Sequence, residues 1–279
     1  MKYCVLYNPL SGDNAGLREK LESAMFGSDY YYMSMPEVTD FNQFFAQVKD
    51  DIIVCGGDGT LNYFINHIAG IPRTNHIFYF DSGSGNDFHT DVHGGERPYS
   101  IDIYLENLPV VRANGQIRYV LNGCGCGIDS YACFEGEKKR AKDGKPINYT
   151  SIVKKGLLYS FKPFRMRITI DGITEEYADV WLAPVMNGKY FGGGVQIAPM
   201  QNRLQNETLS IIIGHAASRF SALKLFPAIF TGTHVNNKKI FKILHGKNIK
   251  IEIDRPMPLQ IDGEIIPDVS VFEVFATKK

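Results

Sequence analysis

Short apolar runs alternate with amphipathic stretches over the first hundred residues. Each apolar run that ends in a turn predicts a strand, namely Tyr3–Asn8, Asp29–Ser34, Asp51–Cys55 and His76–Asp81. Helical spacing follows the first three runs, at Asn14–Met25, at Glu37–Lys49 and in a stretch that ends before Gly70 and places Leu61, Phe64, Ile65, Ile68 and Ala69 on one face. Strands that alternate with helices predict a parallel sheet flanked by helices on both faces.

The pattern changes near residue 99, where strand-like runs follow one another with turns between them. The expected strands are Ile101–Leu105, Val110–Ala113, Ile117–Asn122, Arg165–Ile170, Ala178–Met186, Leu209–Ile213, Lys239–Leu244, Asn248–Ile253 and Ser270–Phe275. Helical spacing interrupts them at about Asp129–Lys139, Ile152–Tyr159 and Ser218–Phe230. Many short strands separated by turn signals predict a mostly antiparallel β-sandwich.

The chain is therefore expected to hold an α/β domain followed by a β-sandwich-like domain. We assign residues 1–104 to the α/β nucleotide-binding domain and residues 105–266 to the β-rich substrate domain. Residues 267–279 are assigned to a C-terminal strand that returns to the first domain. A length of 279 residues fits two domains around one cleft, and the active site is expected in the cleft between them.

Composition narrows the class of protein. The chain is 44% apolar and 22% charged, as is ordinary for a globular protein, and 30 basic residues balance 30 acidic ones. A balanced charge argues against a dedicated nucleic-acid binder, and no apolar run reaches the ~18–20 residues of a membrane span. The five cysteines lack C-x-x-C spacing, so buried, reduced thiols in a cytoplasmic protein are expected rather than a metal site.

Three glycine-bearing loops follow expected strands of the first domain: Asn8–Gly12, Gly56–Thr60 and Gly83–Asp87. Such loops lie at the carboxyl ends of parallel strands, where ligands bind in open α/β sheets. Glycine lets backbone N–H groups approach a phosphate, and the helix after Thr60 points its positive end at its loop. No G-K-[ST] and no complete G-x-G-x-x-G occurs, so a Walker-type loop and a dinucleotide dehydrogenase are disfavoured.

Acidic residues accompany these loops. Asp58 and Asp87 lie inside two of them, and Asp102 lies in an apolar run. Carboxylates beside phosphates repel them unless a cation lies between, and Mg²⁺ held by carboxylates, waters and phosphate oxygens resolves that conflict. Asp262-Gly263-Glu264 follows a late strand, where a plain hairpin turn is the alternative interpretation.

A series of motifs in a fixed order resembles the diacylglycerol kinase catalytic domain family of lipid kinases, which includes soluble bacterial diacylglycerol kinases and sphingosine and ceramide kinases within the NAD-kinase-like superfamily. The resemblance spans essentially the whole chain, through Asn8–Gly12 (NPLSG), Gly56–Asn62 (GGDGTLN), Gly83–Phe88 (GSGNDF), Tyr119–Asn122 with Gly127–Asp129, Asn187–Gly188, Gly192–Gly194, Ala198–Pro199, Phe230–His234 and Gln260–Glu264.

The resemblance implies an ATP- and Mg²⁺-dependent kinase that phosphorylates a lipid hydroxyl. It implies metal contacts at Asp58, Asp87 and Asp102, a general base at Asp262, and Glu264 beside that base in the catalytic site. The implied nucleotide contacts are Asn8, Pro9, Leu10, Ser11, Gly12, Ser34, Gly56, Gly57, Asp58, Gly59, Thr60, Leu61, Asn62, Tyr63 and Ser84.

The sequence departs from the family pattern in one stretch that matters for metal binding. Relatives with a structural magnesium carry an acidic D-G-x-L-D stretch after the A-P motif. Here the corresponding Arg203–Ser210 is one residue longer, with Asn206 and Ser210 where aspartates are expected. We predict that this second metal site is absent or altered.

Three functions stay open at this point. The first is a lipid kinase that works peripherally at the inner face of a membrane, through the apolar and basic stretches Lys154–Phe164, Leu223–Phe230 and Lys238–Lys250. The second is a kinase of a soluble acceptor such as NAD. The late Asp-Gly-Glu and Thr-Gly-Thr-His runs favour a lipid acceptor instead. The third is a non-catalytic nucleotide- or lipid-binding module. The lipid is undetermined, and a homodimer stays open as the assembly.

Overall fold

The computed structural model describes residues 2–9, 14–83, 85–92, 97–144, 147–205 and 207–277. It divides into two compact units, Met1–Asn107 and Leu108–Lys279, which we describe one at a time.

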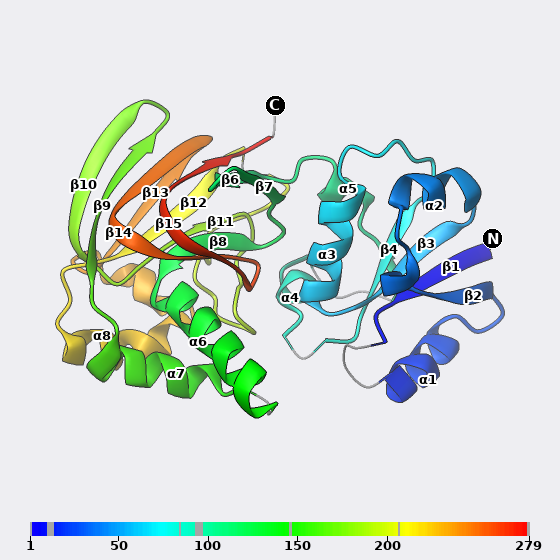
Figure 1. Cartoon of the computed structure of the whole chain (residues 1–279), viewed down its shortest axis with the longest axis horizontal. Helices are drawn as coiled ribbons and strands as arrows, with labels where there is room; N and C mark the ends of the chain where they lie inside the picture. Colours follow the sequence, from blue (N-terminus) through cyan, green and yellow to red (C-terminus); the bar gives the residue numbers. More distant parts are fainter. Residues whose placement is uncertain are drawn as a thin grey trace. The chain divides into compact units, whose positions relative to one another are not determined.

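The first unit is an α/β domain built on a sheet in the order β2-β1-β3-β4-β5 (Figure 1). The strands β1 (Lys2–Tyr7), β2 (Asp29–Ser34), β3 (Asp51–Gly56) and β4 (Ile77–Asp81) run parallel, and β5 (Tyr99–Ser100) is antiparallel to β4. The helical segments are α1 (Asn14–Ala24), a 3-10 turn at Met35–Glu37, α2 (Phe41–Gln47), α3 (Asp58–Ile68), α4 (Asp87–Val92) and α5 (Asp102–Leu105).

Alternating apolar side chains of this sheet are covered on both faces, because neighbouring strand residues point in opposite directions. Leu21 of α1 packs with Val5 and Phe80 in one buried cluster. Phe64 of α3 is fully buried and meets the ring of Phe41 of α2 at 6.0 Å. Each fully buried side chain of this size contributes about 1.5–3 kcal/mol. The parallel sheet with helices on both faces is therefore confirmed.

The second unit is an antiparallel β domain with ten strands among the described residues, along the path β13-β12-β11-β8-β14-β15-β6-β7, with β9 paired to β14 and β10 paired to β9 (Figure 1). Their bounds are β6 (Val110–Ala113), β7 (Gln116–Tyr119), β8 (Gly123–Gly127), β9 (Phe164–Ile170), β10 (Ile173–Val180), β11 (Leu182–Met186), β12 (Leu209–Gly214), β13 (Phe241–Gly246), β14 (Asn248–Ile261) and β15 (Glu264–Phe275).

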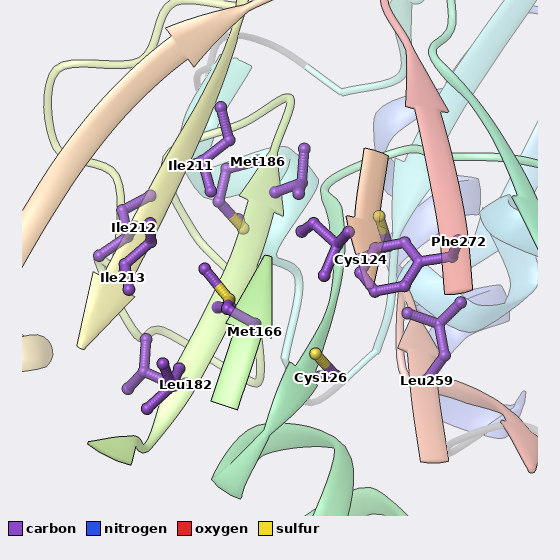
Figure 2. Packing of buried hydrophobic residues seen from close by; sticks show 14 of the residues in the cluster. Cys124, Cys126, Met166, Leu182, Met186, Ile211, Ile212, Ile213, Leu259 and Phe272 are labelled. Atoms are coloured by element: carbon purple, nitrogen blue, oxygen red, sulfur yellow. The ribbon is translucent and has the colours of Figure 1, made fainter. Parts of the chain in front are cut away.

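The long strand β14 joins the two halves of this sandwich. Its first half pairs with β9 from Ile249 to Ile253, and its last residues pair with β8 at Gln260 and Ile261. Side chains from both halves gather in one buried core, shown in Figure 2, which includes Cys124, Met186, Ile211, Leu259 and Phe272. The antiparallel β-sandwich expected from the sequence is confirmed.

Helices cover one side of the second domain (Figure 1). They are α6 (Ile128–Asp143), α7 (Tyr149–Lys155), a π-helical turn at Gly156–Ser160, α8 (Arg219–Leu225) and two 3-10 turns at Phe226–Ile229 and Thr233–Asn236. None of the helices in the described part of the chain is long and apolar enough to cross a membrane. All five cysteines are free, and four of them are buried.

Some local predictions were wrong, among them the single strand expected at Ala178–Met186, which is the end of β10 followed by β11. Ile101–Leu105 is not a strand, because β5 ends at Ser100 and the helix α5 begins at Asp102. The Asp102 carboxylate accepts a hydrogen bond from the N–H of Ile77 at 2.9 Å. The strand β8, with the sequence GCGCG, was missed because glycine disfavours strands. Here a Cβ at Gly125 would lie 2.6 Å from the Cα of Pro184, so only glycine fits beside β11.

The C-terminal strand also differs from the expectation. Residues 267–279 do not return to the first domain over their described part, because β15 pairs with β14 and with β6 inside the second sheet. The single turn at Asp262 and Gly263 leaves β15 no route other than back along β14. The boundary between the units falls after Asn107 rather than after residue 104.

Candidate active site

The carboxyl edge of the first sheet gathers the predicted loops. The strand register places Tyr7 beside both Ser34 and Cys55, and Gly56 beside Asp81. The loops that leave these positions carry Asn8, Pro9, Gly57 and Gly83. Leu10, Ser11, Gly12 and Ser84 lie outside the described residues. One edge therefore carries the glycine loops that the sequence predicted, together with Ser34.

Two of these loops touch backbone to backbone. A Cβ built on Gly83 would lie 2.4 Å from the Cα of Gly57, and a Cβ on Gly57 would lie 2.9 Å from the Cα of Gly83. No real side chain tolerates such distances, so the close approach demands glycine on both sides. The loop after β3 and the loop after β4 therefore form one joined surface.

Asp58 fastens these loops through hydrogen bonds to the start of α4. Its Oδ2 accepts the N–H of Asp87 at 2.7 Å, and its Oδ1 accepts the N–H of Phe88 at 2.9 Å. These two bonds tie the loop after β3 to the helix that follows the loop after β4. Asp87 is itself only 4% exposed. The hydrogen bond from its N–H places Asp58 and Asp87, two of the acidic residues predicted from the sequence, next to each other.

Asp102 lies apart from that pair, which corrects the predicted trio. Its carboxylate accepts the N–H of Ile77, the first residue of β4, and contacts His76 Nδ1 at 2.8 Å, whose pKa it raises. β4 ends at Asp81, four residues later, and a strand rises about 3.3 Å per residue, so roughly 13 Å separates the two edges. Asp102 would join Asp58 and Asp87 only if the strand expected at Ile101–Leu105 carried it to the edge of the sheet at which β4 ends.

The remaining carboxylates fit a magnesium ion better than they fit a closed metal cage. Among the described residues, no cluster of three or more His, Cys, Asp or Glu side chains is placed to hold a metal. Mg²⁺ usually takes one or two carboxylates and fills its other positions with water and phosphate oxygens. Asp58 and Asp87 are two carboxylates at this edge, which is as many as such a site requires.

The first turn of α3 offers backbone rather than side chains. Thr60, Leu61 and Asn62 are buried, and Leu61 is a core residue with no exposed surface, so its predicted nucleotide contact is not made by its side chain. The first helical bond is donated by Leu61 N–H to Gly57, which leaves the preceding N–H groups at the positive helix end. Tyr63 is half-exposed and stacks on His67 with ring centroids 3.9 Å apart.

Asp81, the last residue of β4, anchors the glycine loop that follows this strand. Asn86 Nδ2 donates to its Oδ2 at 3.1 Å, and Arg97 Nε lies 2.7 Å from its Oδ1. Burial raises the pKa of the Asp81 carboxyl, while the nearby His89 and Arg97 oppose the shift. These contacts fix the loop in which Gly83 meets Gly57.

In the second domain, Asp262 is both a hairpin residue and a hydrogen-bonded acid. Asp262 has φ +49° and Gly263 has φ +92°, which is the pattern of a two-residue hairpin turn. The Asp262 carboxylate also accepts three backbone N–H groups, from Leu121 at 2.6 Å, Asn122 at 2.7 Å and Gly123 at 2.9 Å. A plain turn needs none of these bonds, so the side chain has a second role.

Asp129, at the start of α6, is a further, partly buried acid that the sequence singles out only as part of a motif. Burial raises the pKa of its carboxyl from 3.8 to about 6, and backbone N–H groups and Gln260 limit the rise. Gln260 Nε2 donates to its Oδ2 at 3.3 Å, whereas its Oδ1 is buried with no hydrogen-bond partner among the described residues. The predicted Glu264 is exposed nearby; burial, and to a smaller extent the Glu264 charge, raise the pKa of Glu137.

Asp129→Asn is expected to stabilise the protein above pH 6. The native state holds the Asp129 proton more tightly than the unfolded chain, so the wild type loses stability as the pH rises from about 4 through 6. The shift of about two pKa units is worth at most about 3 kcal/mol at pH 7.5. Denaturant unfolding at pH 4 and pH 7.5 measures it, with exposed Asp254→Asn as the control. A difference between Asp129→Asn and wild type that stays constant with pH would contradict it.

In the stretch where the resemblance implies a second magnesium site, Ser210 belongs to a network of neutral side chains. Ser210 Oγ donates to Gln201 Oε1 at 2.5 Å and lies 3.2 Å from His245 Nδ1. Asn206 lies outside the described residues. Glu207, the carboxylate described in this stretch, pairs with Lys247 at 2.8 Å. Arg203, which our sequence analysis did not propose as functional, places a buried guanidinium against Leu121 and Asn122.

Comparisons with known proteins agree with this architecture. The family model of the diacylglycerol kinase catalytic domain matches residues 2–110. The model of the YegS C-terminal NAD kinase beta sandwich-like domain matches residues 124–276. The two matches cover the two structural units in the same order.

Individual relatives match over nearly the whole chain. A diacylglycerol kinase of Mycobacterium tuberculosis is 26% identical over 296 residues, covering 95% of this chain and 93% of that protein. A diacylglycerol kinase of Staphylococcus carnosus is 26% identical over 272 residues, covering 93% and 87%. A crystal structure of a diacylglycerol kinase from Bacillus anthracis shares the fold, with a TM-score of 0.63 at 20% identity over 99% of this chain and 94% of that one. The chain belongs to the diacylglycerol kinase catalytic domain family, in the form that carries a YegS-type C-terminal β-sandwich.

Proposed function

We propose that the protein is an ATP- and Mg²⁺-dependent lipid kinase that transfers the γ-phosphoryl group of ATP to a lipid hydroxyl. The observation that carries the proposal is the joined pair of glycine loops, Gly57 against Gly83, fastened by Asp58 at the carboxyl edge of a parallel sheet. Backbone N–H groups and a carboxylate at such an edge suit a nucleotide triphosphate with its cation. The family relatives named as diacylglycerol kinases support the reaction class.

The first domain would hold the nucleotide. The N–H groups at the start of α3 and in the loop after β4 would bind phosphate oxygens. Asp58 and Asp87 would hold the magnesium ion, which, when bound, neutralises charge on the transferring phosphoryl group. Asn8, Pro9 and Ser34, on neighbouring strand ends, would frame the rest of the nucleotide.

The second domain would supply the acid–base group. Asp262 would accept the proton of the lipid hydroxyl as it attacks, and its three amide donors hold the carboxylate in one orientation. That orientation matters, because phosphoryl transfer depends on how the acceptor hydroxyl is positioned.

An acceptor panel tests the lipid part of this proposal. Purified protein with ATP and Mg²⁺ is incubated with diacylglycerol, a sphingoid base, a ceramide and NAD, each at matched concentration, and the phosphorylated products are identified by mass. We expect turnover of a lipid alcohol and none of NAD. Turnover of NAD in place of every lipid would assign the protein to soluble acceptors.

We also propose that the second domain meets the lipid at the inner face of a membrane, as a cytoplasmic protein that binds peripherally. The π-helical turn after α7 and the start of α8 pack together and leave Tyr159 and Phe220 each 75% exposed. Lys154 and Lys155 are exposed at the end of α7, and Lys224 is exposed on α8. Aromatic rings beside lysines complement an anionic lipid surface.

Replacing Tyr159 and Phe220 together by serine is expected to weaken binding to anionic vesicles by roughly tenfold to a hundredfold, because each ring that enters the interface contributes about 1 kcal/mol or more. Sedimentation with vesicles of phosphatidylglycerol and phosphatidylcholine at two salt concentrations measures it. Ile173→Ser is the matched control, since Ile173 is 72% exposed on β10 of the same domain. Wild-type protein that leaves anionic vesicles unbound would refute the surface.

A further inference from the structure

The peptide group between Leu121 and Asn122 lies between two charged side chains of the second domain. On one side, its carbonyl, that of Leu121, accepts a hydrogen bond from Arg203 Nη1 at 3.0 Å. On the other side, its N–H, that of Asn122, donates to Asp262 Oδ1 at 2.7 Å. A guanidinium and a carboxylate are thus connected through one peptide dipole, aligned with its positive end toward the carboxylate.

The same short segment is held at each of its carbonyl groups. Asn187 Nδ2 also donates to the Leu121 carbonyl at 3.0 Å, and the N–H groups of Asn187 and Gly188 donate to the Asn122 carbonyl at 2.9 and 3.0 Å. The Gly123 carbonyl accepts the N–H of Asp262 at 2.9 Å. The three N–H groups that converge on Asp262 therefore come from a segment whose orientation is set from behind.

Arg203 is the charged member of that support. It is 6% exposed, and its Nη2 also donates to the Asn122 side-chain oxygen at 3.0 Å. A buried guanidinium is costly unless its donors are satisfied and a negative charge is near. Donation to a carbonyl also strengthens the N–H at the other end of the same peptide, because hydrogen bonds in a chain polarise one another.

We propose that Arg203 is a positioning residue for Asp262 and acts through the Leu121–Asn122 peptide. Arg203 fixes and polarises that peptide, and the peptide holds the Asp262 carboxylate in the orientation in which it meets a substrate hydroxyl. The catalytic consequence rests on the proposed function, whereas the mechanical coupling does not. Arg203 gives this chain a built-in cation in the stretch that lacks the expected aspartates.

Amide hydrogen exchange tests the coupling without any substrate. Arg203→Met, Asp262→Asn and the double variant are compared with wild type by exchange measured over residues 121–123. Each single variant is expected to speed exchange there at least tenfold. The double variant is expected to exchange no faster than the faster single variant, because both changes break the same chain of bonds. Arg203→Lys, which keeps the charge but offers no fork, should give an intermediate rate, and it carries the test if Arg203→Met does not fold.

The control is Arg167→Met, which removes an exposed arginine paired with Glu176 on the same domain and should leave exchange at residues 121–123 unchanged. Lipid phosphorylation is followed in parallel, where Arg203→Met should lower kcat at least tenfold with ATP affinity unchanged, and Arg203→Lys should restore part of kcat. Unchanged exchange in Arg203→Met, or effects that simply multiply in the double variant, would overturn the proposal. If exchange is coupled but neither the wild type nor any variant phosphorylates a lipid, the positioning role stands and the proposed kinase activity is refuted.

Discussion

Asp262→Asn is expected to lower the kcat of lipid phosphorylation by about 10²–10⁴ while ATP affinity stays within a few-fold of wild type. General base catalysis contributes that range of rate. The asparagine keeps the size of the side chain but turns an N–H₂ group toward backbone N–H donors, so it also loses at least one of the three bonds from Leu121, Asn122 and Gly123. ATP binding should survive, because the proposed nucleotide contacts lie in the first domain.

Steady-state kinetics with a saturating lipid, together with calorimetric titration of ATP, measures both quantities. Asp254→Asn, which removes an exposed carboxylate from the same strand β14, is the matched control and should keep wild-type kcat. A thermal unfolding scan of each protein shows that the folded state is intact. Full activity of Asp262→Asn would remove Asp262 from the mechanism.

Gly83→Ala is expected to abolish most nucleotide binding. The added Cβ would lie 2.4 Å from the Cα of Gly57, a backbone atom that can move only if the two loops separate. Overpacking of this kind costs about 1–3 kcal/mol, and loops that separate no longer present their N–H groups to one triphosphate. We therefore expect ATP affinity to fall at least about tenfold.

Gly70→Asn provides the control in the same domain. Gly70 has φ +76°, which asparagine tolerates, and a Cβ there meets nothing within 4 Å. Titration of ATP against the three proteins separates the two substitutions. Wild-type affinity in Gly83→Ala would show that the contact of the two loops is not part of the nucleotide site.

The sequence predicted that the glycine loops gather at one edge of the first sheet, because the signals for these loops are local. Each glycine loop directly follows a buried strand, and parallel strands bring their carboxyl ends to one edge whatever the details of packing. The pairing of Asp58 with the start of α4 then follows from where the loops end. Asp102 was misplaced because its role depended on where a strand stopped, and element boundaries are the part that local patterns specify least.

The second domain was harder to predict in detail, because its site is made by contacts between distant residues. Asp262 was identified through the family resemblance, and its own surroundings suggested an ordinary hairpin turn. Its three amide donors lie about 140 positions earlier in the chain. Arg203 likewise reaches Leu121 across 82 positions. No periodicity or spacing in the chain encodes such pairings.

Transfer of labelled phosphate from ATP to lipid tests the central claim most directly. The purified protein is incubated with γ-labelled ATP and diacylglycerol in mixed micelles, with Mg²⁺ and with chelator, and the lipid is separated from the nucleotide and counted. Our account predicts labelled lipid in the presence of Mg²⁺, none with chelator, and a loss of label in Asp58→Asn as well as Asp262→Asn. Tight ATP binding without label in this lipid or any other lipid alcohol would contradict it and would make the protein a nucleotide-binding module.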